Sequence, residues 1–332
     1  MSHGVANGSN LYSLSDNGLL IYQAGGRAAG REHVWFDRAG KAMGAVGTVV
    51  RGQNSFALSP DGTRVAIERS AGTGVDTDLW ITDLEHNTES RFTFDRSLNS
   101  FPVWSPDGSK IAFASNRRGG IYNLYQRASN NTGQDELLLE SKQLNAPLDW
   151  SRDGRFIIFG SIEPKTGRDI LALPLTGDKK PIPLVVSEFQ ESQGQLSPDG
   201  RWMAYTSNES GRFEILVRPF APNWPTPLAG QWQVSTAGGV QPRWRGDGRE
   251  LFYESLDRKL MAVEVKATTQ AFDRGMPRSL FDSPSSQPSN PVSWGYVPSA
   301  DGQRFLISTA PGTTTEAPPL TVVVNWMAAL KK

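Results

Sequence analysis

The chain has 332 residues, and its 34 lysines and arginines balance its 34 aspartates and glutamates. This net charge of zero argues against non-specific nucleic-acid binding, which needs a basic surface to displace counterions. The sequence has no cysteine, which excludes disulfides and thiolate metal sites, and no run approaches the roughly 18 apolar residues of a membrane-spanning helix.

The phrase Ser-Pro-Asp-Gly returns along the chain at a nearly fixed spacing. It stands at Ser59–Gly62, Ser105–Gly108 and Ser197–Gly200, and Ser151–Gly154 has Arg152 in place of proline. The aspartates of these four copies are 46 residues apart, which predicts a modular array. Proline fixes φ, aspartate bonds to the backbone and glycine accepts positive φ, so each copy is predicted to be a tight turn. Degenerate copies stand at 15–18, 245–248 and 299–302.

Short strands are predicted around every turn. In the third repeat they are expected at 101–104, 110–115, 121–126 and 136–140, separated by polar turn residues. Four such strands are typical of a β-propeller blade. The same pattern is predicted in three other repeats. Strands are expected to begin near 56, 64, 78 and 90 in the second, near 193, 202, 214 and 232 in the fifth, and near 241, 250, 259 and 278 in the sixth. The seventh repeat has predicted strands at 294–297, 304–308 and 320–325.

We therefore expect an all-β chain that forms one β-propeller domain over residues 1–332, with four-stranded antiparallel blades. The blades are expected to begin near residues 11, 54, 100, 146, 192, 240 and 293. Seven turns favour seven blades, with six as the alternative. Because the last stretch has only three clear strands and an open edge promotes aggregation, residues near Met1 to Ala6 are expected to add its outer strand.

These blades resemble the TolB-like, WD-repeat-like propeller repeats of bacteria. The Ser-Pro-Asp-Gly turns, the following Ile111-Ala112-Phe113 and the Asn116 turn carry the resemblance. Longer phrases at 207–214, 238–253 and 320–332 look like the propeller that follows the kinase domain of many bacterial Ser/Thr protein kinases. This resemblance implies a sensor or interaction module and favours a periplasmic or extracytoplasmic location. The chain has no His-Arg-Asp or Asp-Phe-Gly motif of a kinase, and its polar start has no apolar signal-peptide segment.

Candidate catalytic and metal-binding residues are few. His3, His33 and His86 fall at different positions of their repeats, so they are not expected to share a catalytic or zinc site. The aspartates that precede glycine in the turns would be calcium ligands on a functional interpretation. We expect them instead to accept hydrogen bonds within their own turns, because turns of successive blades lie too far apart to share an ion. Neither a metal nor a cofactor is predicted.

The first strand of each repeat differs from blade to blade. Its side chains alternate between two faces, and the residue before the turn is large and apolar in nearly all repeats, as at Trp104 and Trp150. The alternate positions are mixed and polar, which is typical of strands that face a water-filled channel, and the polar groups are concentrated in the fourth, fifth and sixth repeats. The predicted ligand-binding residues in the channel are Asn99, Asn145, Asp149, Glu191, Gln193, Gln195, Gln241 and Arg243. One acid, one base and several amides suit a polar small molecule or a peptide end; alternatively, Asp149 and Arg243 compensate each other through water.

The function that fits these features is a non-catalytic recognition or sensor propeller. We expect a monomer that binds a protein, a peptide or a polar small molecule at the channel and the loop face, and that binds no nucleic acid. One alternative is a propeller-type hydrolase or lyase that uses the channel acids Asp149 and Glu191. Another is the propeller lid of a prolyl-oligopeptidase-like peptidase, which would require a catalytic domain that this chain lacks.

Overall fold

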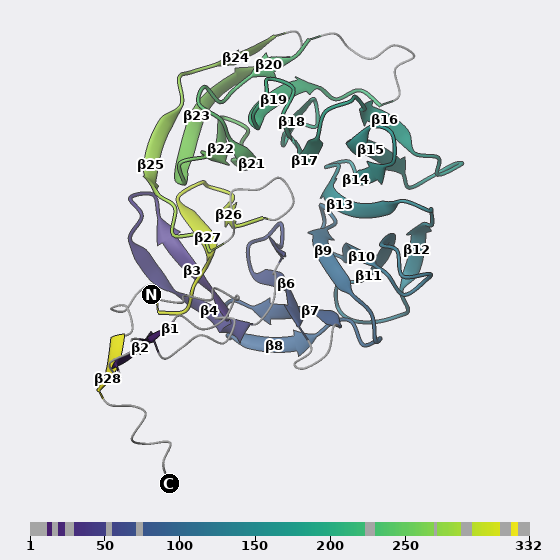
Figure 1. Cartoon of the computed structure of the whole chain (residues 1–332). Helices are drawn as coiled ribbons and strands as arrows, with labels where there is room; N and C mark the ends of the chain where they lie inside the picture. The colour runs from purple at the N-terminus through teal and green to yellow at the C-terminus, as the bar shows by residue number, and fades with distance from the viewer. Residues whose placement is uncertain are drawn as a thin grey trace.

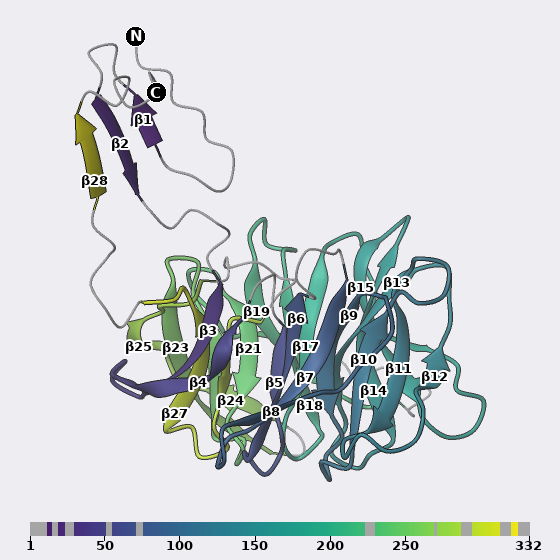
Figure 2. The same ribbon diagram turned by 90° about the horizontal axis from the view of Figure 1, so that it is seen from below.

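The structure is a computed structural model that describes residues 12–14, 19–23, 30–50, 55–70, 76–222, 230–268, 271–286, 294–312 and 320–324. All regular elements in these ranges are β-strands, and none of the described residues forms a helix that could cross a membrane. Six sheets of antiparallel strands surround a central axis, as the view along this axis in Figure 1 and the edge-on view in Figure 2 show.

Five blades are each built from consecutive strands of one repeat, ordered from the axis outward. Blade I contains β5 (Phe56–Leu58), β6 (Arg64–Ser70), β7 (Thr77–Asp83) and β8 (Thr88–Arg91), and blade II contains β9 (Asn99–Trp104), β10 (Lys110–Ser115), β11 (Asn123–Ala128) and β12 (Glu136–Leu139). Blade III contains β13 (Leu144–Trp150), β14 (Phe156–Glu163), β15 (Gly167–Pro174) and β16 (Ile182–Val185), and blade IV contains β17 (Glu191–Leu196), β18 (Trp202–Ser207), β19 (Glu214–Pro219) and β20 (Trp232–Gln233). Blade V contains β21 (Val240–Trp244), β22 (Glu250–Glu254) and β23 (Lys259–Ala267), with both β24 (Phe272–Arg274) and β25 (Arg278–Asp282) paired to β23.

Blade VI joins segments from both parts of the chain and closes the ring. Its inner strands, β26 (Tyr296–Pro298) and β27 (Arg304–Thr309), are followed outward by β3 (Arg31–Asp37) and β4 (Ala42–Val50). The pairing of β27 with β3 leaves no open edge between the first and last repeats. The ring is therefore closed by β3 and β4, while the segment near Met1 to Ala6 lies outside the described residues.

The first predicted repeat does not form a blade, so the propeller has six blades and not the favoured seven. Its two strands, β1 (Tyr12–Leu14) and β2 (Leu19–Gln23), pair with β28 (Leu320–Val324) in a three-stranded sheet. This sheet contributes no strand to the ring (Figure 1). The physical reason is that the last repeat has only two strands of its own in the ring, and β3 and β4 complete it.

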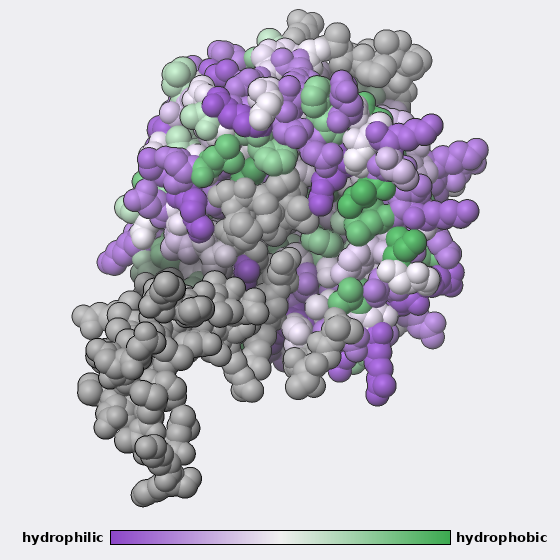
Figure 3. All heavy atoms as spheres, viewed as in Figure 1, coloured by the Kyte–Doolittle hydropathy of each residue, from purple (hydrophilic) through white to green (hydrophobic). Residues whose placement is uncertain are grey.

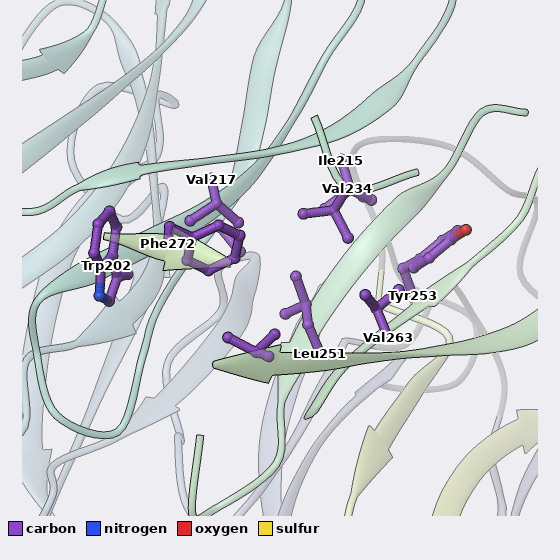
Figure 4. Packing of buried hydrophobic residues seen from close by; sticks show 10 residues of the cluster. Trp202, Ile215, Val217, Val234, Leu251, Tyr253, Val263 and Phe272 are labelled. Carbon is purple, nitrogen blue, oxygen red and sulfur yellow. The ribbon is translucent and has the colours of Figure 1, made fainter. Parts of the chain in front are cut away.

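Apolar side chains pack between adjacent blades. Among the described residues a buried cluster lies at each of the six blade interfaces. Between blades IV and V, Figure 4 shows Trp202 beside Phe272, with ring centroids 5.3 Å apart, and Leu251 and Tyr253 from the neighbouring blade. Where side chains do not pack against a neighbouring blade, many are hydrophilic, as seen around the rim in Figure 3. This packing holds the blades as one disc and fixes the positions of the inner strands.

The repeated turns have the structural role predicted for them. In the first full copy, Asp61 Oδ1 accepts hydrogen bonds from Ser59 Oγ at 2.5 Å and from the Thr63 amide at 3.0 Å, and Gly62 has a φ of 71°. The same serine-to-aspartate bond recurs in the turns of blades II, III, IV and VI. Hydrogen bonds from Ser105 and Ser109 lower the pKa of Asp107 to about 2. The aspartates therefore serve their own turns, as expected.

Candidate functional site

A cavity of about 470 Å³ opens at the end of the ring axis where the Ser-Pro-Asp-Gly turns lie. All six blades contribute to its wall, and turn residues such as Pro60, Pro106 and Arg152 surround its mouth. Deeper in the wall, the next-to-last residues of the six inner strands occupy equivalent positions. In blades I, II and VI these residues are the apolar Ala57, Val103 and Val297. In blades III, IV and V they are the polar Asp149, Gln195 and Arg243.

A β-bulge interrupts four of the inner strands that surround the channel. The pairing of β17 with β18 shifts between Ser192 and Gln195, and β9, β13 and β21 have similar shifts. At the bulge, Phe101, Gln193 and Gln241 have φ of 57°, 56° and 61°, in the left-handed region that residues other than glycine rarely occupy. The strict alternation assumed from the sequence is lost there. Phe101 is in the cavity wall, whereas Gln193 and Gln241 are not.

Gln193 and Gln241 join adjacent blades. Gln193 Oε1 accepts hydrogen bonds from the Gln241 amide at 2.8 Å and from Thr206 Oγ1 at 3.0 Å. Gln241 Oε1 in turn accepts from the Gly295 amide at 2.6 Å, and Ser55 Oγ accepts from the Phe101 amide in the same way at 2.8 Å. These contacts satisfy the backbone donors of Phe101 and Gln241 at the bulges, and that of Gly295 directly before β26. A ligand-binding role for either glutamine remains a prediction.

Asn99 and Glu191 begin their inner strands and Asn145 is the second residue of its strand, so all three lie at the opposite end of the channel from the cavity. Each is buried and forms a hydrogen bond with a residue four positions earlier, which fastens the preceding loop. Asn99 Nδ2 donates to Asp95 Oδ1 at 2.9 Å, and Asn145 Nδ2 donates to Ser141 Oγ at 2.6 Å. Glu191 Oε1 accepts from Ser187 Oγ at 2.6 Å. Burial, with the nearby Asp169 carboxylate, raises the pKa of Glu191. Their contact with a ligand remains a prediction.

Asp149, Gln195 and Arg243 form one connected polar wall across blades III, IV and V. Gln195 Nε2 donates to Leu148 O at 2.7 Å, and Gln195 Oε1 accepts from Arg243 Nη1 at 2.9 Å. Asp149 accepts from two backbone amides, those of Leu196 at 2.7 Å and Trp150 at 2.8 Å. The bonds that run from one blade to the next fix the positions of all three side chains.

The two charges of this wall influence each other without touching. Burial raises the pKa of Asp149, while its two amide donors and the charges of Arg152 and Arg243 oppose this shift. Burial lowers the pKa of Arg243 to about 10, so the guanidinium is protonated at neutral pH. Within the described residues no ion pair joins Asp149 to Arg243, and each uses other hydrogen-bond partners.

Two residues of the site were not predicted. Trp294, from blade VI, is buried, and the guanidinium carbon of Arg243 lies 3.5 Å from its ring centroid. Arg152 is exposed at the cavity mouth. The sequence signal for Arg152 was its replacement of the proline that Pro60, Pro106 and Pro198 supply in other turns. Trp294 had no such signal, because only the closed ring brings it under Arg243.

The structure does not bring the two channel acids together. Asp149 occupies the position equivalent to Gln195. Because of the bulge, Glu191 and Gln195 pair with Ser207 and Ala204 of β18, three residues apart, which corresponds to about 10 Å along the channel at ~3.3 Å per residue. The described ranges also contain no group of three or more histidine, aspartate or glutamate side chains that could hold a metal ion.

Six blades of four or five antiparallel strands around a central channel define the class of protein: the chain is a six-bladed β-propeller. It belongs to the TolB beta propeller domain family, whose sequence profile matches residues 39–215. The attachment of such a propeller to a kinase remains a prediction.

Known proteins place this fold in several contexts. A segment of 104 residues is 30% identical to the uncharacterized peptidase YuxL of Bacillus subtilis (strain 168), covering 30% of this chain and only 16% of that protein. The putative TolB of Agrobacterium tumefaciens superimposes with a TM-score of 0.63 at 18% identity, over 85% of this chain and 99% of that one. An oligogalacturonate lyase of Vibrio parahaemolyticus superimposes with a TM-score of 0.53 at 10% identity, over 96% and 83%. These two structural likenesses show the fold alone.

Proposed function

We propose that this chain is a non-catalytic recognition propeller that binds its ligand in the cavity at the turn end of the channel. The observation that carries this proposal is the one-sided polar wall of Asp149, Gln195 and Arg243, opposite apolar residues at the equivalent positions of the other blades. Ligand sites combine a few fixed polar groups with a largely apolar surface, and cavities of about 300–1,000 Å³ suit small ligands. A polar small molecule or the end of a peptide fits these properties.

The positions of the acids support a role without catalysis. Backbone amides of Trp150 and Leu196 hold the Asp149 carboxylate against the wall. The carboxyl pairs that act on glycosidic bonds stand about 5–9.5 Å apart, whereas Asp149 and Glu191 lie on different blades and at levels about 10 Å apart along the channel. The alternative of a hydrolase or lyase that uses this acid pair therefore has less support than recognition.

A second candidate function is the propeller part of a peptidase. The observation that favours it is the 104-residue segment that is 30% identical to YuxL, a protein described as a peptidase. A propeller in such a protein would admit or select substrates, with catalysis elsewhere, so the cavity would again be a recognition surface. A sensor propeller and a peptidase propeller differ in the partner, which for the sensor would be a protein outside the peptidase class.

Binding and turnover can be separated in one experiment. The chain would be screened by thermal shift against dipeptides, sugars and organic acids, and every hit would be repeated with Arg243→Gln and with Arg118→Gln. Arg118 is an exposed arginine on a loop away from the cavity, with an ion pair to Glu140 at 3.0 Å, and is the matched control. We expect hits that are lost in Arg243→Gln alone. Turnover in an esterase, peptidase or lyase screen, or hits unchanged in Arg243→Gln, would contradict the proposal.

A further inference from the structure

We infer that the ligand of this cavity presents a carboxylate to Arg243, an inference that rests on the proposed function. Arg243 is a cation in the channel wall whose hydrogen-bonding capacity is only partly used. Nη1 donates to Gln195, whereas Nε is buried without a hydrogen-bond partner among the described residues. The described part of the chain offers this guanidinium no carboxylate at ion-pair distance. Because a desolvated charge is costly when unpaired, an incoming anion would gain from pairing with it.

The neighbouring carboxylates already have other donors. Asp149, the nearest in the wall, accepts the amides of Leu196 and Trp150. Asp61 and Asp301, at the mouth, accept from Ser59 and Ser299 and from backbone amides of their own turns. The acids of the cavity are thus held by local donors, and the group left with unused donors is Arg243.

The stacking of Arg243 selects a planar anion. The Trp294 ring lies 3.5 Å from the guanidinium carbon and covers one face of the group, while Gln195 holds one of its terminal nitrogens. The side chain is therefore fixed in position before a ligand arrives, which reduces the ordering cost of binding. A carboxylate matches the fork of a guanidinium with two parallel hydrogen bonds, which a neutral amide or hydroxyl cannot reproduce.

A second cation and an apolar part of the cavity wall indicate what the rest of the ligand is like. Arg152 stands at the mouth, where three other turns have proline, and a cationic mouth raises the local concentration of anions. Phe101, Pro147 and Trp244 are also in the wall and offer apolar contact. The ligand class is therefore an organic acid with an apolar or ring-shaped body, either a free small molecule or the C-terminal residue of a peptide.

The test uses pairs of probes that differ only in charge. N-acetyl-L-phenylalanine and its amide represent a peptide end, and D-glucuronate and D-glucose represent a small ring acid. Isothermal titration of the full chain should give about tenfold or greater preference for the acid of at least one pair, since charged hydrogen bonds are worth roughly 1.5–3 kcal/mol. The pair that binds identifies the source of the carboxylate.

Four variants locate the contact. Arg243→Gln should abolish acid binding, and Arg243→Lys, which keeps the charge but loses the fork, should weaken it about tenfold. Arg152→Pro, which restores the residue of the other turns, should weaken it by a smaller factor, and Arg118→Gln should leave it unchanged. Melting temperatures would verify that each variant is folded.

The outcomes separate this inference from the proposed function. If acid and neutral probes bind equally and both depend on Arg243, the cavity is a recognition site and the carboxylate inference is wrong. If neither acid binds, or acids bind equally well to wild type and folded Arg243→Gln, the inference is also overturned. Turnover of the probes would instead contradict the non-catalytic role and leave the carboxylate contact standing.

Discussion

A buried carboxylate between blades V and VI, where the ring closes, pairs with three arginines. Glu250, on β22 of blade V, pairs with Arg38 of blade VI, with Arg278 at 2.8 Å and with Arg245 at 3.4 Å. Arg38 also donates to Gly302 O at 2.8 Å, so it links the turn between β3 and β4 both to blade V and to the turn between β26 and β27. The change Glu250→Gln removes the anion and leaves three cations together.

The expected loss of stability in Glu250→Gln follows from the burial of the four side chains. The Glu250 side chain is 7% exposed, whereas those of Arg38, Arg245 and Arg278 are 22%, 29% and 52% exposed, so water screens the cations in part. Breaking a fully buried pair costs about 3–5 kcal/mol, and an exposed pair is worth about 0–1 kcal/mol. We therefore expect Glu250→Gln to lower the free energy of unfolding by about 2–3 kcal/mol. Tm would fall by about 3–4 °C, because the unfolding entropy of a chain of 332 residues is about 0.7 kcal/mol/K.

Urea and thermal denaturation would measure this change against a matched control. Glu140→Gln removes one partner of a single pair with Arg118 whose side chains are 51% and 58% exposed, and should cost less than about 0.5 kcal/mol. A drop in Tm of less than about 1 °C for Glu250→Gln, or equal effects of the two changes, would refute the role of Glu250 in closure.

Three further changes test other parts of the structure. Burial lowers the pKa of His33 to about 3 from an ordinary 6.5, so the unfolded chain binds more protons between these values and stability falls as pH drops below 6.5. His33→Phe should flatten the urea midpoint against pH over this range, and parallel curves for variant and wild type would contradict this. Burial raises the pKa of Glu68 to about 7 from 4.5, so the stability that its proton supplies is complete below 4.5 and is lost as pH rises through 7. Glu68→Gln should therefore be more stable than wild type at alkaline pH, by about 1–3 kcal/mol in urea, and a less stable variant there would show that the carboxylate is accommodated. Gln241→Ala leaves the Gly295 amide without its acceptor and should cost about 1–3 kcal/mol in the same assay; a loss below about 0.5 kcal/mol would remove the blade-to-blade role of this side chain.

Turn chemistry made the strands predictable. The predicted strands at 110–115 and from residue 202 agree with β10 and β18, because the Ser-Pro-Asp-Gly turn fixes where the preceding strand ends and the next begins. The number of blades was not predictable in this way. Pairing of Leu306 with Trp35 joins residues far apart in the sequence, and nothing in either segment specifies its partner. A last repeat with few strands of its own was the only signal of this exchange.

Counting residues back from the repeated turns also predicted part of the candidate site. Asp149, Gln195 and Arg243 lie between the bulge and the turn, so counting back from the turn places them correctly. Gln193 and Gln241 lie at the bulge, where a left-handed residue other than glycine leaves no mark in the sequence. Trp294 could not be assigned to the wall before the ring was known to close with blade VI next to blade V.

A crystal structure of the chain with a bound organic acid tests the central claim most directly. With N-acetyl-L-phenylalanine or D-glucuronate, whichever binds in solution, the structure should show the carboxylate on the guanidinium of Arg243, which remains stacked on Trp294. The body of the ligand should fill the cavity beneath the Ser-Pro-Asp-Gly turns. An acid bound instead at the Asn99, Asn145 and Glu191 end of the channel, or on the outer rim of the disc, would contradict the account.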